Sequence, residues 1–107
     1  MDAYGGAINR IPKGATAFVH RDQVFSIQYV AGASSAADAD WLRGFRAAMA
    51  PYVSGQAYQN YMDPELEHPN IAYYATNLTR LRIVKARYDQ KNVFRFPRSV
   101  LPALPPA

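Results

Sequence analysis

The stretch from Gln56 to Phe96 constrains the fold most, because it joins three different structural signals within one continuous segment. Ser54-Gly55 is followed over Gln56–Tyr61 by two tyrosines and several amide side chains, and we interpret this segment as a short strand. A basic segment beginning near Asn77 has apolar residues at helical spacing, and Asp89–Asn92 has the composition of a turn. The stretch therefore predicts a strand, a helix and a tight turn that fold as one unit.

Within the predicted strand, Tyr58, Asn60 and Tyr61 place two phenols and a carboxamide close together. Such a concentration of polar groups is unusual for a segment that only fills a core. We therefore treat these three side chains as candidates for binding or chemistry.

Upstream, three more segments are strand candidates. Residues 7–11 give a weak signal between two glycine-containing turns, and residues 16–20 give a better one. Residues 24–30 give the strongest signal, because Phe25, Ile27 and Tyr29 alternate with polar or smaller residues and should face a layer of helices.

The first predicted helix follows Ser35, which can cap it together with Asp38 three residues later. Its apolar residues lie four, four and three positions apart and form one stripe, which we interpret as core, until Pro51 interferes with the helix. The stripe consists of Trp41, Phe45, Met49 and Tyr52.

A proline-broken acidic loop at residues 62–70 leads to a single helical turn at residues 71–74. Asn77 is then expected to cap a second helix, whose apolar stripe is Leu81, Val84 and Tyr88. We expect an α+β fold, in which a small antiparallel sheet of three or four strands is packed on one face by two main helices. Residues 1–96 should form the domain and residues 97–107 a proline-rich tail, extended or loose.

Composition excludes several classes of site. The chain of 107 residues has no cysteine, which excludes disulfides, thiolate catalysis and zinc–thiolate sites. His20 and His68 lie far apart without clustered acids, so we predict no metal site. No apolar run is long enough for a membrane span and no signal peptide is visible, so we expect a soluble, cytoplasmic chain that contacts no membrane.

Positive charge is concentrated near the C-terminus. Between Arg80 and Arg98 there are seven basic residues and one acidic residue, while the rest of the chain has five basic and seven acidic residues. This segment can contact an acidic partner or the phosphates of a nucleic acid. Its cations lie on a helix whose other face is needed for core and no nucleic-acid motif is present, so we do not favour a nucleic-acid partner.

Several blocks of the sequence resemble one known family. They are Ala57-Tyr58-Gln59-Asn60-Tyr61, Tyr73-Tyr74 with Asn77, Arg80-Leu81 with Val84-Lys85, and Tyr88-Asp89 with Asn92 and Phe94. Together they resemble the C-terminal module of berberine bridge enzyme-like FAD-linked oxidases. The segments around Phe18-Val19-His20-Arg21 and Ile27-Gln28-Tyr29 are similar to the preceding strands of that family's substrate domain. The resemblance covers nearly the whole chain, but the large FAD-binding half of such oxidases has no counterpart in it.

The resemblance implies roles for the polar residues of the predicted strand. Tyr61 would lie beside the flavin and the substrate and would help to remove a hydroxyl proton, while Tyr58, Asn60 and Asn77 would line the cofactor. A phenol has an ordinary pKa of about 10, so it needs a nearby cation or hydrogen bond to act as a base near neutral pH. Tyr58 is also explained as a half-buried strand aromatic, which is the interpretation we favour for it; for Tyr61 we favour the functional one.

Gln28 matches a family position where an acid or amide helps to activate the substrate, and Ser26 matches a neighbouring inward position. A glutamine can orient a substrate hydroxyl but cannot usefully accept its proton, which leaves deprotonation to Tyr61. An exposed polar strand face explains Gln28 and Ser26 equally well.

Two functions therefore remain open from the sequence. By resemblance, the chain is the substrate-binding and flavin-covering part of an FAD-dependent oxidoreductase, with FAD held mainly by an absent domain or chain and no independent turnover. Without that partner, an exposed sheet could drive homo-oligomerisation. The alternative is a basic binding module that uses the Arg80–Arg98 segment.

Overall fold

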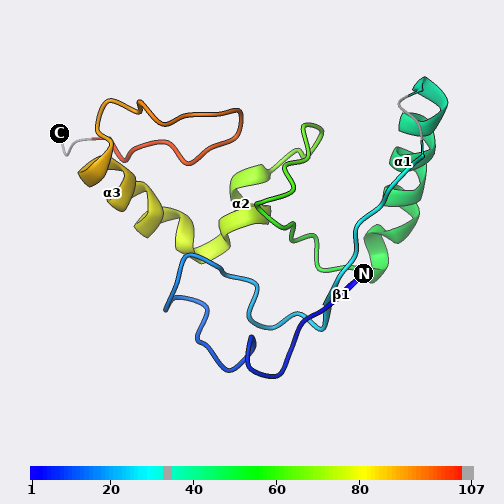
Figure 1. Ribbon diagram of the computed structural model, residues 1–107, viewed down its shortest axis with the longest axis horizontal. Helices are drawn as coiled ribbons and strands as arrows, with labels where there is room; N and C mark the ends of the chain where they lie inside the picture. The colour runs from blue at the N-terminus through cyan, green and yellow to red at the C-terminus, as the bar shows by residue number, and fades with distance from the viewer. Residues whose placement is uncertain (33–34, 105–107) are drawn as a thin grey trace.

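The computed structural model describes residues 1–32 and 35–104. Three helices follow a minimal sheet, and the helices lie in a row with α2 between α1 and α3 (Figure 1). The elements in chain order are β1 (Asp2–Ala3), β2 (Phe25–Ser26), α1 (Ala36–Met49), η1 (Ala50–Tyr52), α2 (Pro69–Tyr74), η2 (Ala75–Asn77) and α3 (Leu78–Tyr88).

The sheet is smaller than the sequence predicts. In the described residues it has two antiparallel strands, with Asp2 paired to Ser26 and Ala3 paired to Phe25. The expected strands at residues 7–11, 16–20 and 56–61 are not formed, so the prediction of three or four strands is wrong for the described chain. The α+β class itself is confirmed.

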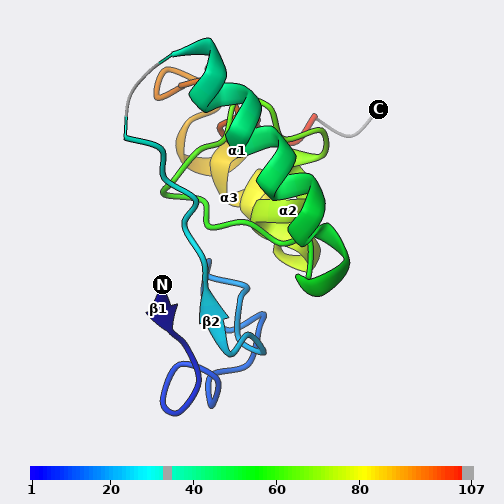
Figure 2. The same cartoon turned by 90° about the vertical axis from the view of Figure 1, so that its right-hand side faces the viewer.

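A side chain replaces the missing strand pairing in the N-terminal region. The Arg21 guanidinium donates to the carbonyl oxygens of Phe18 at 3.2 Å and Ile8 at 3.1 Å, and to Thr16 Oγ1 at 2.8 Å. These bonds hold the loops around Arg21, so their backbone groups do not form a β-ladder. Figure 2 shows β1, β2 and the N-terminal loops below the helices. Neither α1 nor α3 packs on the sheet, contrary to the prediction, because two strands of two residues offer too small a face.

Helix α1 begins and ends as the sequence predicts. Ser35 Oγ accepts from the Asp38 backbone N–H at 3.2 Å, and the Asp38 carboxylate accepts from the Ser35 backbone N–H at 3.1 Å. This reciprocal pair is a capping box, and Pro51 lies in the short η1 turn that follows the helix.

The apolar stripe of α1 is exposed, so its predicted core position is wrong for this chain. Trp41 is 55% exposed and Tyr52 is 81% exposed. Trp41 and Phe45 stack on each other at 5.3 Å, and Tyr29 meets Phe45 edge-on at 5.0 Å. Apart from the adjoining η1, no other helix or strand of the described residues packs on α1.

The buried core is small and centres on α2. Ala72, Tyr73 and Tyr74 are buried there, together with Val19 and His20 from the N-terminal region. Asn77 is buried as well, and it lies at the N-cap position of α3 without the predicted side-chain cap bond. The predicted stripe of α3 is largely exposed, with Tyr88 75% exposed.

The chain after α3 is held by polar contacts. The Asp89 carboxylate accepts from the backbone N–H groups of Val93 at 2.7 Å and Phe94 at 3.0 Å, and it binds the Lys85 ammonium at 2.5 Å. The predicted turn at residues 89–92 is therefore formed, with Asn92 at φ +50°. The described residues after Pro97 form no helix or strand, but they are docked, since the Ala103 N–H donates to the Arg82 carbonyl at 3.0 Å. Residues 105–107 of the predicted tail lie outside the described part.

The chain exposes more surface than its size requires. Its accessible surface is 8049 Å², whereas a folded monomer of this mass exposes about 6,000 Å². Its radius of gyration is 16.0 Å, against about 13 Å for a compact domain of this length. About 2,000 Å² of surface is therefore left uncovered, relative to an independent domain.

Candidate functional site

The residues that the sequence singles out form a turn, which we call the tyrosine turn (residues 58–61). The Tyr61 N–H donates to the Tyr58 carbonyl at 3.1 Å, and Asn60 Nδ2 donates to Tyr58 Oη at 2.9 Å. The Tyr58 and Tyr61 rings meet edge-on at 5.4 Å. The turn therefore brings the three predicted side chains into one cluster, although they do not lie on a strand.

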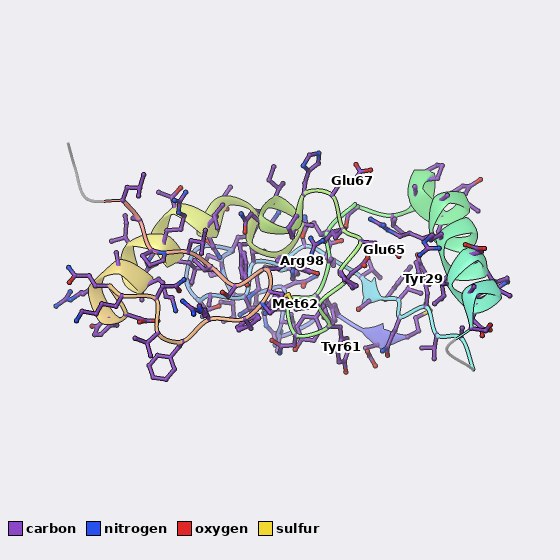
Figure 3. All side chains as sticks on the ribbon, turned by 90° about the horizontal axis from the view of Figure 1, so that it is seen from above. Tyr29, Tyr61, Met62, Glu65, Glu67 and Arg98 are labelled. Carbon is purple, nitrogen blue, oxygen red and sulfur yellow. The ribbon has the colours of Figure 1, made fainter. Side chains whose placement is uncertain are left out.

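The two tyrosines of this turn differ in exposure. Tyr58 is half-buried, and its ring lies 6.2 Å from the Phe18 ring. Tyr61 is 59% exposed and lies at the rim of the molecule (Figure 3). Tyr61 is thus the ring that is available to a ligand or to another part of a larger protein, while Tyr58 supports it from behind.

Both ends of the tyrosine turn are fixed to buried parts of the chain. Before the turn, Gln56 Oε1 lies 2.7 Å from His20 Nδ1, and the Ala57 N–H donates to the Ala72 carbonyl at 3.0 Å. After the turn, the Asp63 N–H donates to Tyr73 Oη at 2.8 Å. His20 and Tyr73 were not identified as site residues from the sequence; His20 directly after the apolar pair Phe18-Val19 was the available signal.

An acidic loop at residues 62–67 follows the turn and connects it to α1 (Figure 3). The Arg43 guanidinium binds Glu65 at 2.6 and 2.9 Å, and this contact holds the pKa of Glu65 below its ordinary value. Asp63 lies 3.9 Å from Arg46 of the same helix. Because these pairs are exposed, they orient α1 more than they stabilise the fold.

Arg98 fixes the same acidic loop from the C-terminal side. Its guanidinium donates to the Leu66 carbonyl at 2.6 Å and also to the Pro64 carbonyl. The loop therefore lies between α1 and the C-terminal segment; Figure 3 labels Glu65 on the loop and Arg98 on the C-terminal segment. These contacts fix the chain directly after Tyr61.

Gln28 and Ser26 are not joined to the tyrosine turn. Ser26 lies in β2, and Gln28 is exposed two residues beyond it. In residues 1–32 and 35–104, no hydrogen bond connects either side chain to Tyr58, Asn60 or Tyr61. The catalytic role of Gln28 stays a prediction.

Asn77 is committed to a structural contact. Its Nδ2 donates to the carbonyls of Lys13 at 2.8 Å and Thr16 at 3.1 Å, and its side chain is buried. These bonds join the start of α3 to the N-terminal loop. A role of Asn77 at a cofactor stays a prediction.

Several cations of the basic segment are also bound within the chain. Arg80 donates to the Gly14 carbonyl at 2.9 Å, Lys85 binds Asp89, and Arg98 holds the acidic loop. This arrangement leaves fewer free cations for an acidic partner than the sequence suggests. Among the described residues, there is no cluster of metal-ligating side chains and no helix long and apolar enough to cross a membrane.

A groove lies elsewhere, between the start of α2 and the C-terminal segment. Its volume is about 510 Å³, and Asn70, Asn92, Arg95 and Phe96 contribute to its lining. None of the tyrosine-turn residues line it. We place the candidate site at the tyrosine turn, because the groove is shallow and has no clustered reactive groups.

Comparisons with known proteins identify relatives over nearly the whole chain. Residues 57–101 match the family described as berberine and berberine like. The FAD-linked oxidoreductases YvdP and YgaK of Bacillus subtilis are 40% and 36% identical to 94% and 95% of this chain. Chitooligosaccharide oxidase of Gibberella zeae is 30% identical over 95% of the chain. The chain spans 23% of the length of each of these three relatives.

A solved structure has the same fold. It is a variant of Phl p 4, described as a glucose oxidase, and it superposes with a TM-score of 0.81 at 30% sequence identity. The match covers 96% of this chain and 26% of that chain. The open shape of this chain is therefore shared with a segment of that larger protein.

Proposed function

We propose that this chain, which carries the C-terminal berberine-like module of the berberine bridge enzyme-like FAD-linked oxidoreductases, forms the substrate-binding and flavin-covering part of such an enzyme. We further propose that it has no turnover without an FAD-binding part. The observation that carries the proposal is the exposed tyrosine turn, which is fixed at both ends on a chain whose other surfaces are incompletely covered.

The groups on the turn fit one edge of a flavin. The Tyr61 ring offers an exposed aromatic surface against which a flat ring system can pack. Asn60 uses one N–H on Tyr58, so its amide oxygen remains able to accept a hydrogen bond from a ring N–H. The glycine-rich loop that commonly binds a dinucleotide pyrophosphate is not among the sequence motifs of this chain, so the phosphates must be held elsewhere.

The proposed chemistry divides between the cofactor and the side chains. When bound, FAD supplies the acceptor for a hydride from an alcohol-type substrate. Tyr61 takes the hydroxyl proton, and Gln28 orients that hydroxyl. Within the described residues, the Tyr61 ring packs against the Tyr58 ring and has no cation stacked on it, so a group from another part of the enzyme is needed to make its phenol a better base.

The uncovered surface supports a partner of large size. About 2,000 Å² on one side of an interface belongs to the class of permanent, obligate contacts rather than transient ones. A separate FAD-binding domain or chain of an enzyme four times longer can supply such a contact. In its absence, the exposed Trp41 and Phe45 on α1 are better placed for self-association than the two-residue strands.

The decisive experiment grafts this chain into YvdP in place of the matching segment. We expect the graft to bind FAD, and we expect Tyr61→Phe and Asn60→Ala to change the visible flavin spectrum. Tyr88→Phe is the matched control, because Tyr88 is also highly exposed but lies outside the turn.

Two results would contradict the proposal. One is a grafted protein that folds and binds FAD with a spectrum that is insensitive to both turn variants. The other is oxidation of alcohols or sugars by the purified 107-residue chain supplied with FAD alone.

A further inference from the structure

The tyrosine turn is held in place by buried side chains rather than by strand pairing. We propose that His20 and Tyr73 are positioning residues, which set the orientation of Tyr58 and Tyr61 from inside the protein. This inference deepens the proposed function and rests on it only for its flavin measurement. Neither residue belongs to the turn itself.

His20 acts on the segment before the turn. Its side chain is 2% exposed, and its Nδ1 lies 2.7 Å from Gln56 Oε1. A carboxamide oxygen only accepts hydrogen bonds, so in this pair Nδ1 carries the proton and donates it. The bond spans 36 positions of the sequence and fixes the residue two positions before Tyr58.

Ring contacts provide a second connection from His20 to the turn. The His20 ring meets the Phe18 ring edge-on at 5.2 Å, and Phe18 in turn meets Tyr58 at 6.2 Å. Tyr58 continues this series to Tyr61 at 5.4 Å. Moving the imidazole would therefore shift both the backbone before the turn and the ring that supports Tyr61.

Tyr73 acts on the segment after the turn. It is 1% exposed, and its hydroxyl accepts from the Asp63 N–H at 2.8 Å, two residues beyond Tyr61. The neighbouring Ala72 carbonyl accepts from Ala57 N–H on the other side of the turn. Helix α2 therefore holds both ends of the turn, and His20 adds a third fixed point from the N-terminal region.

The positioning role differs from simple core packing in its dependence on single polar atoms. Tyr73→Phe removes one hydroxyl and keeps the ring. Gln56→Ala removes the partner of His20 without changing the core residue itself. His20→Asn keeps an N–H donor close to the position of Nδ1, whereas His20→Phe keeps a ring without it. Val19→Ala is the packing control, because Val19 is equally buried and changes volume only.

The test uses the full chain with ¹³C-labelled tyrosine rings, together with amide hydrogen exchange. We expect Tyr73→Phe to speed exchange of the Asp63 amide about tenfold or more. We expect Gln56→Ala and His20→Phe to shift the ring signals of Tyr58 and Tyr61, and His20→Asn to restore them. In the wild type, ¹⁵N spectra should show the His20 proton on Nδ1.

The outcomes separate the two proposals. Ring shifts in Gln56→Ala and Tyr73→Phe no larger than in Val19→Ala would overturn the positioning role. In the YvdP graft, the same variants should alter the flavin spectrum as Tyr61→Phe does. A graft without bound FAD would contradict the proposed function, while the ring shifts and exchange rates would still decide whether His20 and Tyr73 position the turn.

Discussion

Replacing Asn77 tests how the N-terminal loop is attached to the helices. Asn77 is buried, and its amide nitrogen donates to the Lys13 carbonyl at 2.8 Å and the Thr16 carbonyl at 3.1 Å. Both bonds join segments more than 60 positions apart in the sequence. Asn77→Ala removes both donors and leaves two carbonyl groups without these partners.

The size of the effect follows from these two bonds. At about 1 kcal/mol net for each, Asn77→Ala should lower the free energy of unfolding by about 2 kcal/mol. For a chain of this size, that corresponds to a fall in Tm of about 8 °C. Asn77→Asp should cost more than Asn77→Ala, because it places carboxylate oxygens against carbonyl oxygens at the same distances.

Urea and thermal unfolding followed by circular dichroism measure this loss, with the exposed Asn70→Ala as the matched control. A loss for Asn77→Ala no greater than that of the control would refute the structural role of these bonds. If the stability fell as expected while FAD binding by the YvdP graft stayed unchanged at low temperature, Asn77 would have no direct role at the cofactor.

Three further predictions concern charged and aromatic side chains. The Lys85 ammonium and two backbone N–H groups lower the pKa of Asp89, so this carboxylate stabilises the turn above the ordinary aspartate pKa. That contribution should disappear as the pH falls through the lowered folded value, and Asp89→Asn should remove this part of an acid unfolding profile. The exposed Arg43–Glu65 pair should show a coupling in a double-mutant cycle that weakens with added salt; a salt-independent coupling would contradict it. Finally, Trp41→Gln should reduce any self-association seen in analytical ultracentrifugation, and an unchanged sedimentation profile would place the contact elsewhere.

Local signals in the sequence predicted the helices well. The Ser35 cap, the stop near Pro51, the short turn of helix at residues 71–74 and the turn after Tyr88 all depend on residues within a few positions of each other. These features need no partner outside the local segment, so a single sequence contains the information for them.

The strand predictions failed for a physical reason. The compositions of residues 16–20 and 56–61 fit a strand, but a strand forms only when another backbone pairs with it. In the described chain the Arg21 guanidinium donates a hydrogen bond to the Phe18 carbonyl, and the Ala57 N–H donates to the Ala72 carbonyl. Sequence spacing does not show whether a backbone group bonds to a neighbouring strand or to another group. For the same reason, the sequence did not predict the contacts of His20 and Tyr73.

The sequence predicted which residues cluster at the site, but it predicted the wrong backbone conformation for them. Tyr58, Asn60 and Tyr61 do cluster, since they are close in sequence and a turn brings them together as well as a strand would. Gln28 is brought in only by family resemblance, and the described chain provides no hydrogen bond that connects it to the cluster. Its role beside Tyr61 stays a prediction.

The exposed stripe of α1 is the feature of this chain that most favours the proposed covering partner. Its spacing has the amphipathic pattern of a helix that packs against a core, yet Trp41 is 55% exposed in the chain alone. Hydrophobic spacing predicts that a helix face is buried, but it does not identify the chain or domain that buries this face. Since the fold matches a segment that makes up 26% of a larger solved protein, the simplest source of the cover is the rest of such a protein. If so, acrylamide should quench Trp41 fluorescence readily in the free chain and poorly in the YvdP graft, and equal quenching in both would show that this face stays open.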